Sequence, residues 1–386
     1  MGKVARHLDT LLVHAGEPSP LIEGAVGIPI FQSSTYQYRG ESSHDTARYV
    51  RLSNTPNHIA LHRKLAAVEN AEAALVTASG MAAISTTLLA LLRPGDHILA
   101  QDCLYGGTHA LMFAEFPRLN IEVDLIDGDA PTSWAARVKS NTRAIYVETI
   151  SNPLMQVPDL KAVASFARER RLISIIDNTF ASPVNFRPAE HGFDLSLHSA
   201  TKYLNGHSDV VAGAVIGHAA LVERISHLLT RLGGSLDPHA CFLVHRGMKT
   251  LGVRMRHQNE AALRIARFLE QHPKVATVNY PGLENHPRHQ RARELFDGFG
   301  GMLSFEIKGG VEVADRFLSK LALPICAPSL GGVESLITRP ATTSHAAMPE
   351  ADRQRAGITN SLIRFSVGLE AAEDLIDDFA KALAAC

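Results

Sequence analysis

One lysine in this chain stands where its amine could act as a nucleophile. Lys202 follows an apolar segment that begins at Leu197, and a loop punctuated by glycines comes after it. A lysine in a partly apolar pocket loses its charge readily, and the neutral amine can form a Schiff base with an aldehyde. The nearby Ser199 and Thr201 could donate hydroxyl hydrogen bonds to a phosphate. Together they outline a site for pyridoxal phosphate (PLP), although so short a pattern is more often a solvated loop.

Polar residues also follow two predicted strands. Asp177 comes directly after an apolar strand over 172–176, and Glu148 and Asn152 follow another over 144–147. In open α/β sheets, ligands bind beyond the carboxyl ends of the strands. We therefore expect the chemistry to take place at these positions.

A third candidate is the Ser79-Gly80-Met81 segment. It separates a short apolar strand over 74–78 from a long apolar helix. A helix that starts after a strand and a few small residues directs its first backbone N–H groups at a phosphate. The segment therefore predicts an anion site beside the reactive lysine.

These residues need an α/β scaffold, and the chain has the pattern of one. Apolar strands alternate with helices, which predicts a large, mostly parallel sheet covered on both faces. The expected strands are 74–78, 97–100, 121–126, 144–147 and 172–176, and the expected helices include 57–71, 160–169, 221–232 and 247–269. A strand over 302–307, a helix over 311–322 and an apolar segment over 361–368 predict a smaller C-terminal α/β domain.

The length of 386 residues suits two domains. Residues 1–55 are interrupted by proline and glycine, and so long an irregular segment is expected to be an arm that grips a neighbouring subunit. We expect the PLP-binding domain over 56–250 and the C-terminal domain over 251–386.

The composition excludes several classes of function. Lys and Arg number 38 against 39 Asp and Glu, so nucleic acid and anionic membranes are not expected partners. The four cysteines are far apart, and His286 and His289 flank a proline, so neither a disulfide framework nor a metal site is expected. No signal peptide or membrane span is evident. These features predict a cytoplasmic protein.

Several motifs, in this order along the chain, resemble those of the Cys/Met-metabolism family of PLP enzymes, the cystathionine γ-synthases, γ-lyases and β-lyases. The motifs are Ser79-Gly80-Met81, Tyr105-Gly-Gly-Thr108, Asn152-Pro153, Asp177-Asn-Thr-Phe180 and Ser199-Ala-Thr-Lys202. The resemblance extends from Thr10 to Glu370. It implies PLP as cofactor and the type I, aspartate-aminotransferase-like fold of PLP-dependent transferases.

The resemblance also implies roles around the cofactor ring. Lys202 would hold PLP as a Schiff base and then act as the mobile acid and base. Asp177 would pair with the pyridine nitrogen, so that the ring can accept electrons. Tyr105, the second catalytic residue, would stack on the ring face. Asn152 would lie near the 3′-oxygen of the cofactor and the carboxylate of the substrate.

The phosphate would have its own set of contacts. The backbone N–H groups of Gly80 and Met81 and the hydroxyls of Ser199 and Thr201 would surround it, and Thr179 belongs to the cofactor site as well. Tyr49-Val-Arg51 matches a Tyr-x-Arg that reaches the phosphate of a neighbouring subunit. A planar guanidinium suits phosphate. The resemblance thus implies shared active sites and a homotetramer built of two dimers.

Three residues would contact the substrate besides Asn152. Arg364 matches the arginine that clamps the substrate α-carboxylate, and Ser329 matches a residue at the same end. Thr338 occupies the position at which some γ-lyases carry a glutamate for the distal ammonium of cystathionine. Because Thr338 is neutral, that ammonium must be recognised elsewhere or bound weakly.

Two departures from the family pattern stand out. The family usually has Asn-Pro-Thr after the Tyr-x-Arg, whereas this chain has Asn54-Thr55-Pro56-Asn57. The exchange moves the proline restriction one residue along. Methionine γ-lyases carry a cysteine where this chain has Gly107, which disfavours that activity.

Three functions remain open at this stage. The first is a PLP-dependent trans-sulfuration enzyme that acts at Cγ of cystathionine or of an activated homoserine, as γ-lyase or γ-synthase. The second is a cystathionine β-lyase, which releases homocysteine, pyruvate and ammonia. The third is a PLP-binding protein without turnover, against which the joint presence of Asp177, Tyr105 and Arg364 argues.

Overall fold

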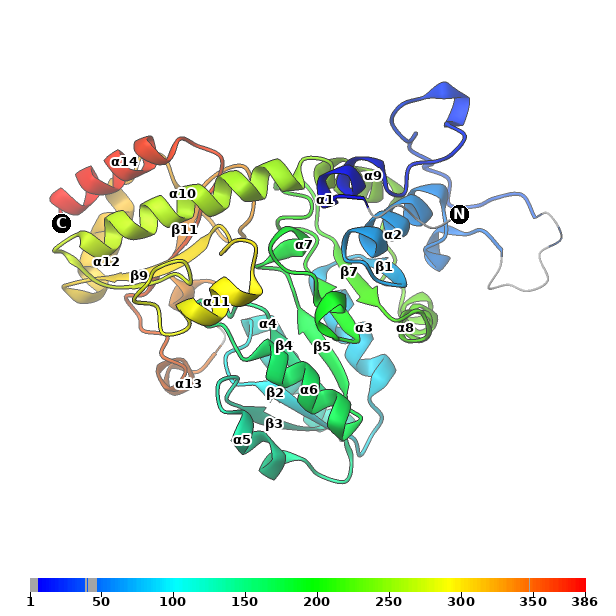
Figure 1. The fold of residues 1–386 in the computed structure, drawn as a ribbon, viewed down its shortest axis with the longest axis horizontal. Coiled ribbons are helices and arrows are strands. Elements are labelled where there is room, and N and C mark those ends of the chain that lie inside the picture. Colours follow the sequence, from blue (N-terminus) through cyan, green and yellow to red (C-terminus); the bar gives the residue numbers. More distant parts are fainter. Residues whose placement is uncertain (1–5, 39, 41–46, 347) are drawn as a thin grey trace.

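A seven-stranded sheet forms the centre of the larger part of the molecule (Figure 1). The computed structural model describes residues 6–38, 40, 47–346 and 348–386. The strand order is β1-β7-β6-β5-β4-β2-β3. The strands are β1 (Ala73–Thr77), β2 (His97–Gln101), β3 (Glu122–Ile126), β4 (Thr142–Glu148), β5 (Ile173–Asp177), β6 (Leu195–His198) and β7 (Gly213–Gly217). Neighbours from β6 to β3 are parallel, and β7 is antiparallel to both β1 and β6. The predicted mostly parallel sheet is therefore present, with one reversed strand.

Helices cover both faces of this sheet, which is why its central strands are apolar throughout. One face packs against α2 (Pro56–Val68), α6 (Leu160–Arg170) and α9 (Pro238–Met248). The other face packs against α3 (Gly80–Leu91) and α8 (Ala219–Leu232). Successive residues of β5 alternate between these two cores: Ile175 lies in the α3–α8 core and Ile176 in the α2–α6–α9 core. By the same alternation Asp177 faces the α3 side of the sheet.

A second, five-stranded sheet forms the C-terminal part of the chain, in the order β10-β11-β12-β9-β8. Its strands are β8 (Val275–Asn279), β9 (Met302–Ile307), β10 (Ile325–Cys326), β11 (Leu336–Thr338) and β12 (Ile363–Ser366). The helices α10 (Leu251–Gln271), α12 (Gly310–Lys320) and α14 (Ala372–Ala384) contribute to its core. Figure 1 shows α10 running from the large sheet to the small one, and its residues join both cores. The fold is the predicted type I fold, a large sheet unit plus a smaller one.

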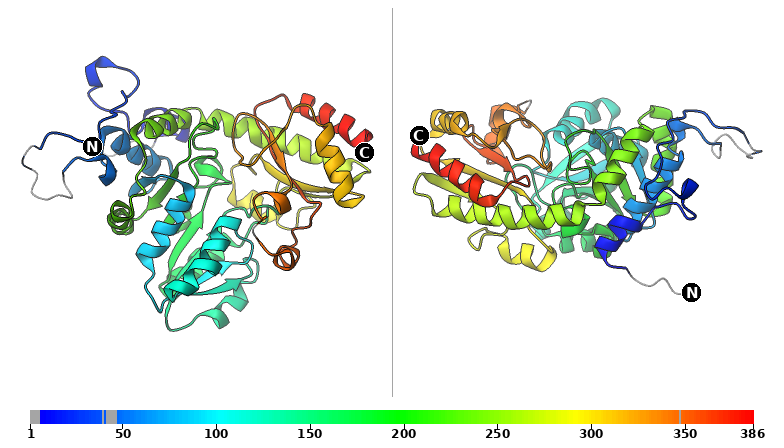
Figure 2. Two further views of the ribbon diagram at one scale, coloured as in Figure 1. Left: turned by 180° about the vertical axis from the view of Figure 1, so that it is seen from behind. Right: turned by 90° about the horizontal axis from the view of Figure 1, so that it is seen from above.

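The remaining helices are short. They are α1 (Leu8–His14), α4 (Gly106–Ala110), α5 (Pro131–Trp134), α7 (Ser182–Asn185), α11 (His289–Leu295) and α13 (Glu350–Arg355). Helix α1 packs against α2 and α10. The described residues that follow it extend away from the body, at the end opposite the C-terminus (Figure 2). Several of their apolar side chains are exposed, among them Val26 and Tyr38.

Most predicted elements agree with the structure to within a few residues, and the differences have local causes. The predicted helix over 247–269 is two helices, because α9 ends at Met248 and α10 begins only at Leu251. The prediction missed the short β6 and β7, which flank the lysine loop. The unusual Thr55-Pro56 order places Thr55 directly before α2 and makes Pro56 the first residue of that helix. Proline is tolerated there, because the first N–H groups of a helix have no intrahelical partner.

No helix in the described ranges is both long and apolar enough to cross a membrane. Those ranges also contain no cluster of three or more His, Cys, Asp or Glu side chains that could hold a metal ion. The division of the chain at about residues 55 and 250 stays a prediction.

Candidate active site

A cavity of about 630 Å³ lies where the two sheet units meet. Its walls come from the carboxyl ends of β4 and β5, the N-terminus of α3, the loop after β6, and β12. Such a volume suits a cofactor or small ligand. Eleven of the predicted site residues line it: Gly80, Met81, Tyr105, Asn152, Asp177, Thr179, Ser199, Thr201, Lys202, Ser329 and Arg364. Tyr49, Arg51 and Thr338 do not.

Lys202 lies in the turn after β6, half-buried, and its amine is directed into the cavity. Its Nζ donates a hydrogen bond to Oγ of Ser329 at 2.8 Å. Burial lowers the pKa of Lys202 to about 8, and the positive charge of Arg364 acts in the same direction. A lysine of this kind exists partly as the neutral amine near neutral pH, as Schiff-base formation requires.

Asp177 ends β5 and points into the same cavity. Its Oδ1 accepts hydrogen bonds from the backbone N–H and the hydroxyl of Thr179. Burial raises the pKa of Asp177, whereas the Thr179 hydrogen bonds and the nearby His198 oppose that rise. A positively charged group bound in the cavity would lower the pKa of Asp177 again and favour its ionised form.

The N-terminus of α3 forms the end of the cavity that suits a phosphate. Ser79 caps the helix by accepting a hydrogen bond from the N–H of Ala82. The N–H groups of the first helical residues, Gly80 and Met81, have no carbonyl partner within the helix. A Cβ on Gly80 would lie only 2.8 Å from Cβ of Ser199, so glycine permits the close approach of these two segments.

Tyr105 and its glycines form the opposite wall. Tyr105 immediately precedes α4 and is 38% exposed, with its ring along the cavity. A Cβ on Gly107 would lie 2.6 Å from Cε1 of Tyr105 and 2.9 Å from Sδ of Met81. Gly107 is therefore needed for the ring position seen here, and a cysteine at this position would displace the ring.

Glu148 is a site residue to which the sequence analysis assigned no role. It ends β4, directly beside Asp177 in the sheet, and is 4% exposed. Its Oε1 accepts the N–H of Tyr105 at 2.5 Å, and its Oε2 accepts the N–H of Asn152 at 3.3 Å. Burial and the neighbouring Asp177 raise the pKa of Glu148 well above its ordinary value. Its position after an apolar strand indicated a site residue. Its role could not be predicted, because Tyr105, whose N–H it binds, is 43 residues away in sequence.

Arg364 occupies the far end of the cavity, on β12. Its Nη1 donates to Oδ1 of Asn152 at 3.2 Å and its Nη2 to the carbonyl of Ser329 at 3.0 Å. The guanidinium is buried, and within the described residues no carboxylate forms an ion pair with it. Burial lowers the pKa of Arg364 to about 10, so it remains charged near neutral pH. A buried cation without a counter-ion is suited to bind an anionic ligand.

The other three predicted residues lie outside the cavity. Thr338 is buried on β11 as the strand partner of Arg364, and among described residues its hydroxyl has no hydrogen-bond partner. Arg51 lies over the ring of Tyr49 and donates to the carbonyl of Thr230 at 3.0 Å. The contact predicted for Tyr49 and Arg51 is with a second copy of the chain, so it stays a prediction.

These residues fit PLP. The amine of Lys202 could bind an aldehyde, the α3 N-terminus could bind a phosphate, and the Asp177 carboxylate could pair with a protonated ring nitrogen. When bound, PLP supplies an electron sink for amino-acid substrates. The fold and this arrangement define the class: a PLP-dependent enzyme of the type I fold.

Comparisons with known proteins narrow the class. The sequence model for the Cys/Met metabolism PLP-dependent enzyme matches residues 9–384. The chain is 42% identical to a cystathionine beta-lyase of Coxiella burnetii over 98% of both chains. It is 44% identical to a cystathionine gamma-lyase of Bacillus subtilis over 97% of this chain and 98% of that one. The crystal structure of cystathionine gamma-lyase from Lactobacillus plantarum complexed with L-serine superposes with a TM-score of 0.94, at 38% identity and over 98% and 99% of the two chains. The chain belongs to the Cys/Met metabolism family of PLP-dependent enzymes.

Proposed function

We propose that this protein is a trans-sulfuration enzyme that cleaves or forms the bond at Cγ of cystathionine or of an activated homoserine. The observation that carries the substrate class is the uncompensated, buried Arg364 next to Lys202 in one cavity. An α-amino acid has a carboxylate that Arg364 can bind and an amine that can take the place of the Lys202 amine. A protein that merely carries PLP needs no such carboxylate site.

The residues have distinct tasks in this proposal. Arg364 binds the substrate carboxylate with its planar fork, and its hydrogen bonds to Asn152 and Ser329 keep that fork in one plane. Lys202, once displaced by the substrate amine, is free to take the α-proton, for which a pKa near neutrality suits it. Chemistry at Cγ requires a second proton removal, from Cβ, and the same lysine would serve as the base.

Other residues of the cavity would support proton transfer by Lys202. Asp177 would hold a protonated ring nitrogen of the cofactor, and Tyr105 would limit the movement of the ring. The cavity wall is mostly apolar around Ile84, Ile150 and Val211, which keeps water away from the reacting carbons.

The β-lyase activity is the alternative, because relatives named beta-lyase and gamma-lyase are almost equally similar to this chain. One experiment distinguishes them. Purified protein with PLP is incubated with cystathionine, or with O-succinylhomoserine plus cysteine, and the products are identified. Cysteine with 2-oxobutyrate indicates γ-elimination, newly formed cystathionine a synthase, and homocysteine with pyruvate the β-lyase. Absence of all products would overturn the enzymatic proposal in favour of a PLP carrier.

We also propose that the active site is completed by a second copy of the chain. The phosphate end of the cavity, around Gly80 and Ser199, has no arginine among its lining residues. Within this chain Arg51 contacts only the carbonyl of Thr230 and the ring of Tyr49 among the interactions of the described residues, and in the proposed assembly its guanidinium would reach the phosphate of a neighbouring subunit. We place the N-terminal arm at residues 1–55, ahead of a PLP-binding domain and a C-terminal domain, in a cytoplasmic homotetramer.

A further inference from the structure

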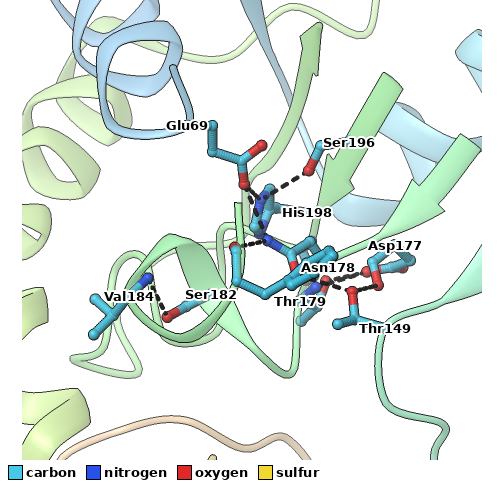
Figure 3. A network of polar contacts seen from close by, with 11 residues as sticks. Glu69, Thr149, Asp177, Asn178, Thr179, Ser182, Val184, Ser196 and His198 are labelled. Carbon is cyan, nitrogen blue, oxygen red and sulfur yellow. Dashed lines mark hydrogen bonds and ion pairs between the residues drawn. The ribbon is translucent and has the colours of Figure 1, made fainter. Parts of the chain in front are cut away.

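A buried ion pair lies on the face of the large sheet that is turned away from the cavity (Figure 3). It joins Glu69, at the C-terminal end of α2, to His198, the last residue of β6. The carboxylate Oε1 and the imidazole Nε2 are 2.6 Å apart, and the two residues are 0% and 2% exposed. Burying two such polar groups is costly, so we ask whether the pair has a role beyond stability.

One oxygen of Glu69 has two hydrogen-bond partners. Its Oε1 accepts from Nε2 of His198 and also from Nδ2 of Asn178, at 3.1 Å. Its Oε2 is buried and has no partner in the described part of the chain. Oε1 of Glu69 therefore links His198 to Asn178.

Asn178 is held in a single orientation by this acceptor. Its Nδ2 donates to Glu69 and to the carbonyl of Phe186 at 2.9 Å, and its Oδ1 accepts from the hydroxyl of Thr149 at 2.8 Å. Exchanging the amide oxygen and nitrogen would put the oxygen against the Glu69 carboxylate. Asn178 is fully buried, so water cannot substitute for any of these partners.

The same contacts reach both groups that hold the cofactor. Thr149 donates its N–H to the carbonyl of Asp177 at 3.0 Å, and its hydroxyl oxygen, which donates its one hydrogen to Asn178, lies 3.1 Å from the same carbonyl. Asn178 N–H bonds to the carbonyl of Leu197 on β6, the strand that leads into the Lys202 turn. Figure 3 shows Asn178 between His198 with Glu69 and Thr149 with Asp177. Glu69 therefore ties the ends of β5 and β6 together.

His198 adds an electrostatic effect. Its charge is one of the causes that hold the pKa of Asp177 down against burial. Supporting residues of this kind orient the groups that touch a bound cofactor, as partners behind metal ligands do.

We propose that Glu69, with Asn178 and His198, is a positioning residue for the cofactor: from the far face of the sheet it fixes the main chain that carries the Asp177 carboxylate and the start of the Lys202 turn. The inference rests on the proposed pairing of Asp177 with the ring nitrogen of PLP. Asp177 contacts the cofactor, whereas Glu69 acts only through Asn178 and His198.

The test compares Glu69→Ala, Glu69→Gln and Asn178→Ala with wild type and with Asp177→Asn. The readouts are the dissociation constant for PLP, the circular dichroism of the bound cofactor and the ¹⁵N chemical shift of its labelled ring nitrogen. Glu69→Ala and Asn178→Ala should weaken PLP binding by about tenfold or more, the effect of losing a hydrogen bond to a charged group. They should also move the ¹⁵N shift toward that of Asp177→Asn. Glu69→Gln keeps an acceptor. Its PLP dissociation constant and ¹⁵N shift should therefore lie between those of the two alanine variants and those of wild type.

His97→Gln is the matched control. His97 is equally buried in the same sheet, on β2, and bonds to Thr142 at 2.8 Å away from the cavity lining. It should lower thermal stability without altering the PLP readouts. Glu69 and Asn178 variants that behave like His97→Gln would overturn the proposal and leave the network purely structural. Should Glu69→Ala fail to fold, Glu69→Gln and Asn178→Ala decide by the same criterion. If Asp177→Asn itself leaves the ¹⁵N shift unchanged, the pairing of Asp177 with PLP is wrong instead.

Discussion

Ser329 connects the reactive amine of Lys202 to the guanidinium of Arg364. Its hydroxyl accepts from Nζ of Lys202 at 2.8 Å and its carbonyl accepts from Nη2 of Arg364 at 3.0 Å. The residue has a φ of +87°, in the left-handed region that side chains rarely adopt, at a typical cost of about 1–3 kcal/mol. Such a conformation persists only where the surrounding structure holds it in place. Here it places the hydroxyl and the carbonyl of Ser329 between the amine of Lys202 and the guanidinium of Arg364.

The first prediction concerns the pH dependence of cofactor uptake. Burial lowers the pKa of Lys202 from 10.5 to about 8, and only the neutral amine attacks an aldehyde. The rate of PLP binding to cofactor-free protein should therefore rise with pH, with a midpoint near 8, and level off above it. Stopped-flow absorbance measures this rate, and Lys202→Ala should show no covalent phase and no turnover. A midpoint near 10.5 would contradict the effect of burial.

The second prediction separates substrate binding from cofactor binding. Arg364→Lys keeps the charge but loses the planar pair of donors. The value of kcat/KM for the amino-acid substrate should fall roughly 10- to 100-fold, while PLP affinity stays near that of wild type. The control is Arg264→Lys, an exposed arginine paired with Glu373, which should behave as wild type. Equal losses in substrate and PLP affinity would contradict the assignment of Arg364 to the substrate carboxylate.

A third prediction follows from the two hydrogen bonds of Glu148. Glu148→Ala leaves the N–H groups of Tyr105 and Asn152 without their acceptor. The free energy of unfolding of the cofactor-free protein should fall by roughly 1–3 kcal/mol, as measured by denaturant titration. The value of kcat should fall as well, because Tyr105 loses its backbone anchor. Unchanged kcat in a destabilised protein would show that Glu148 supports the fold alone.

The fourth prediction concerns the space beside Tyr105. Gly107→Ala puts a Cβ at 2.6 Å from the Tyr105 ring, which must move. Circular dichroism of bound PLP and kcat should both change. Gly27→Ala is the control, since nothing lies within 4 Å of its added Cβ. A wild-type dichroism signal in Gly107→Ala would mean that the ring position tolerates a side chain here.

The fifth prediction tests the shared active site. Arg51→Ala and Lys202→Ala should each be inactive, the first through loss of a phosphate contact in the partner's site. In hybrid dimers one of the two sites contains neither substitution, so unfolding and refolding an equal mixture should restore roughly a quarter of wild-type activity. The restored activity is measured with the substrate identified in the product assay. An equal mixture that stays inactive would place Arg51 in the site of its own subunit or outside any site.

The α/β order, and the placement of Lys202 and of the strand-end Asp177 in one cavity, were accessible from the sequence, because each depends on local patterns. The apolar runs of β4 and β5 are buried on both faces, and the glycines at 80 and 107 mark close approaches of the backbone. Family motifs added Arg364 and Ser329, which no local pattern would have selected. The start of the long helix was placed wrongly, since the break between α9 and α10 involves only residues 249 and 250.

Other features depend on which segments pack together. Glu148 binds Tyr105 across 43 residues, and Glu69 binds His198 across 129, so neither pairing leaves a periodic signal. Thr338 was expected in the substrate site, yet the register of β11 and β12 leaves it beside Arg364 and outside the cavity lining. Local sequence determines which residues are chemically reactive and which helix, strand or loop carries each of them. Tertiary packing alone decides which distant side chains support them, because it creates the buried surroundings in which a lone carboxylate must find its partners.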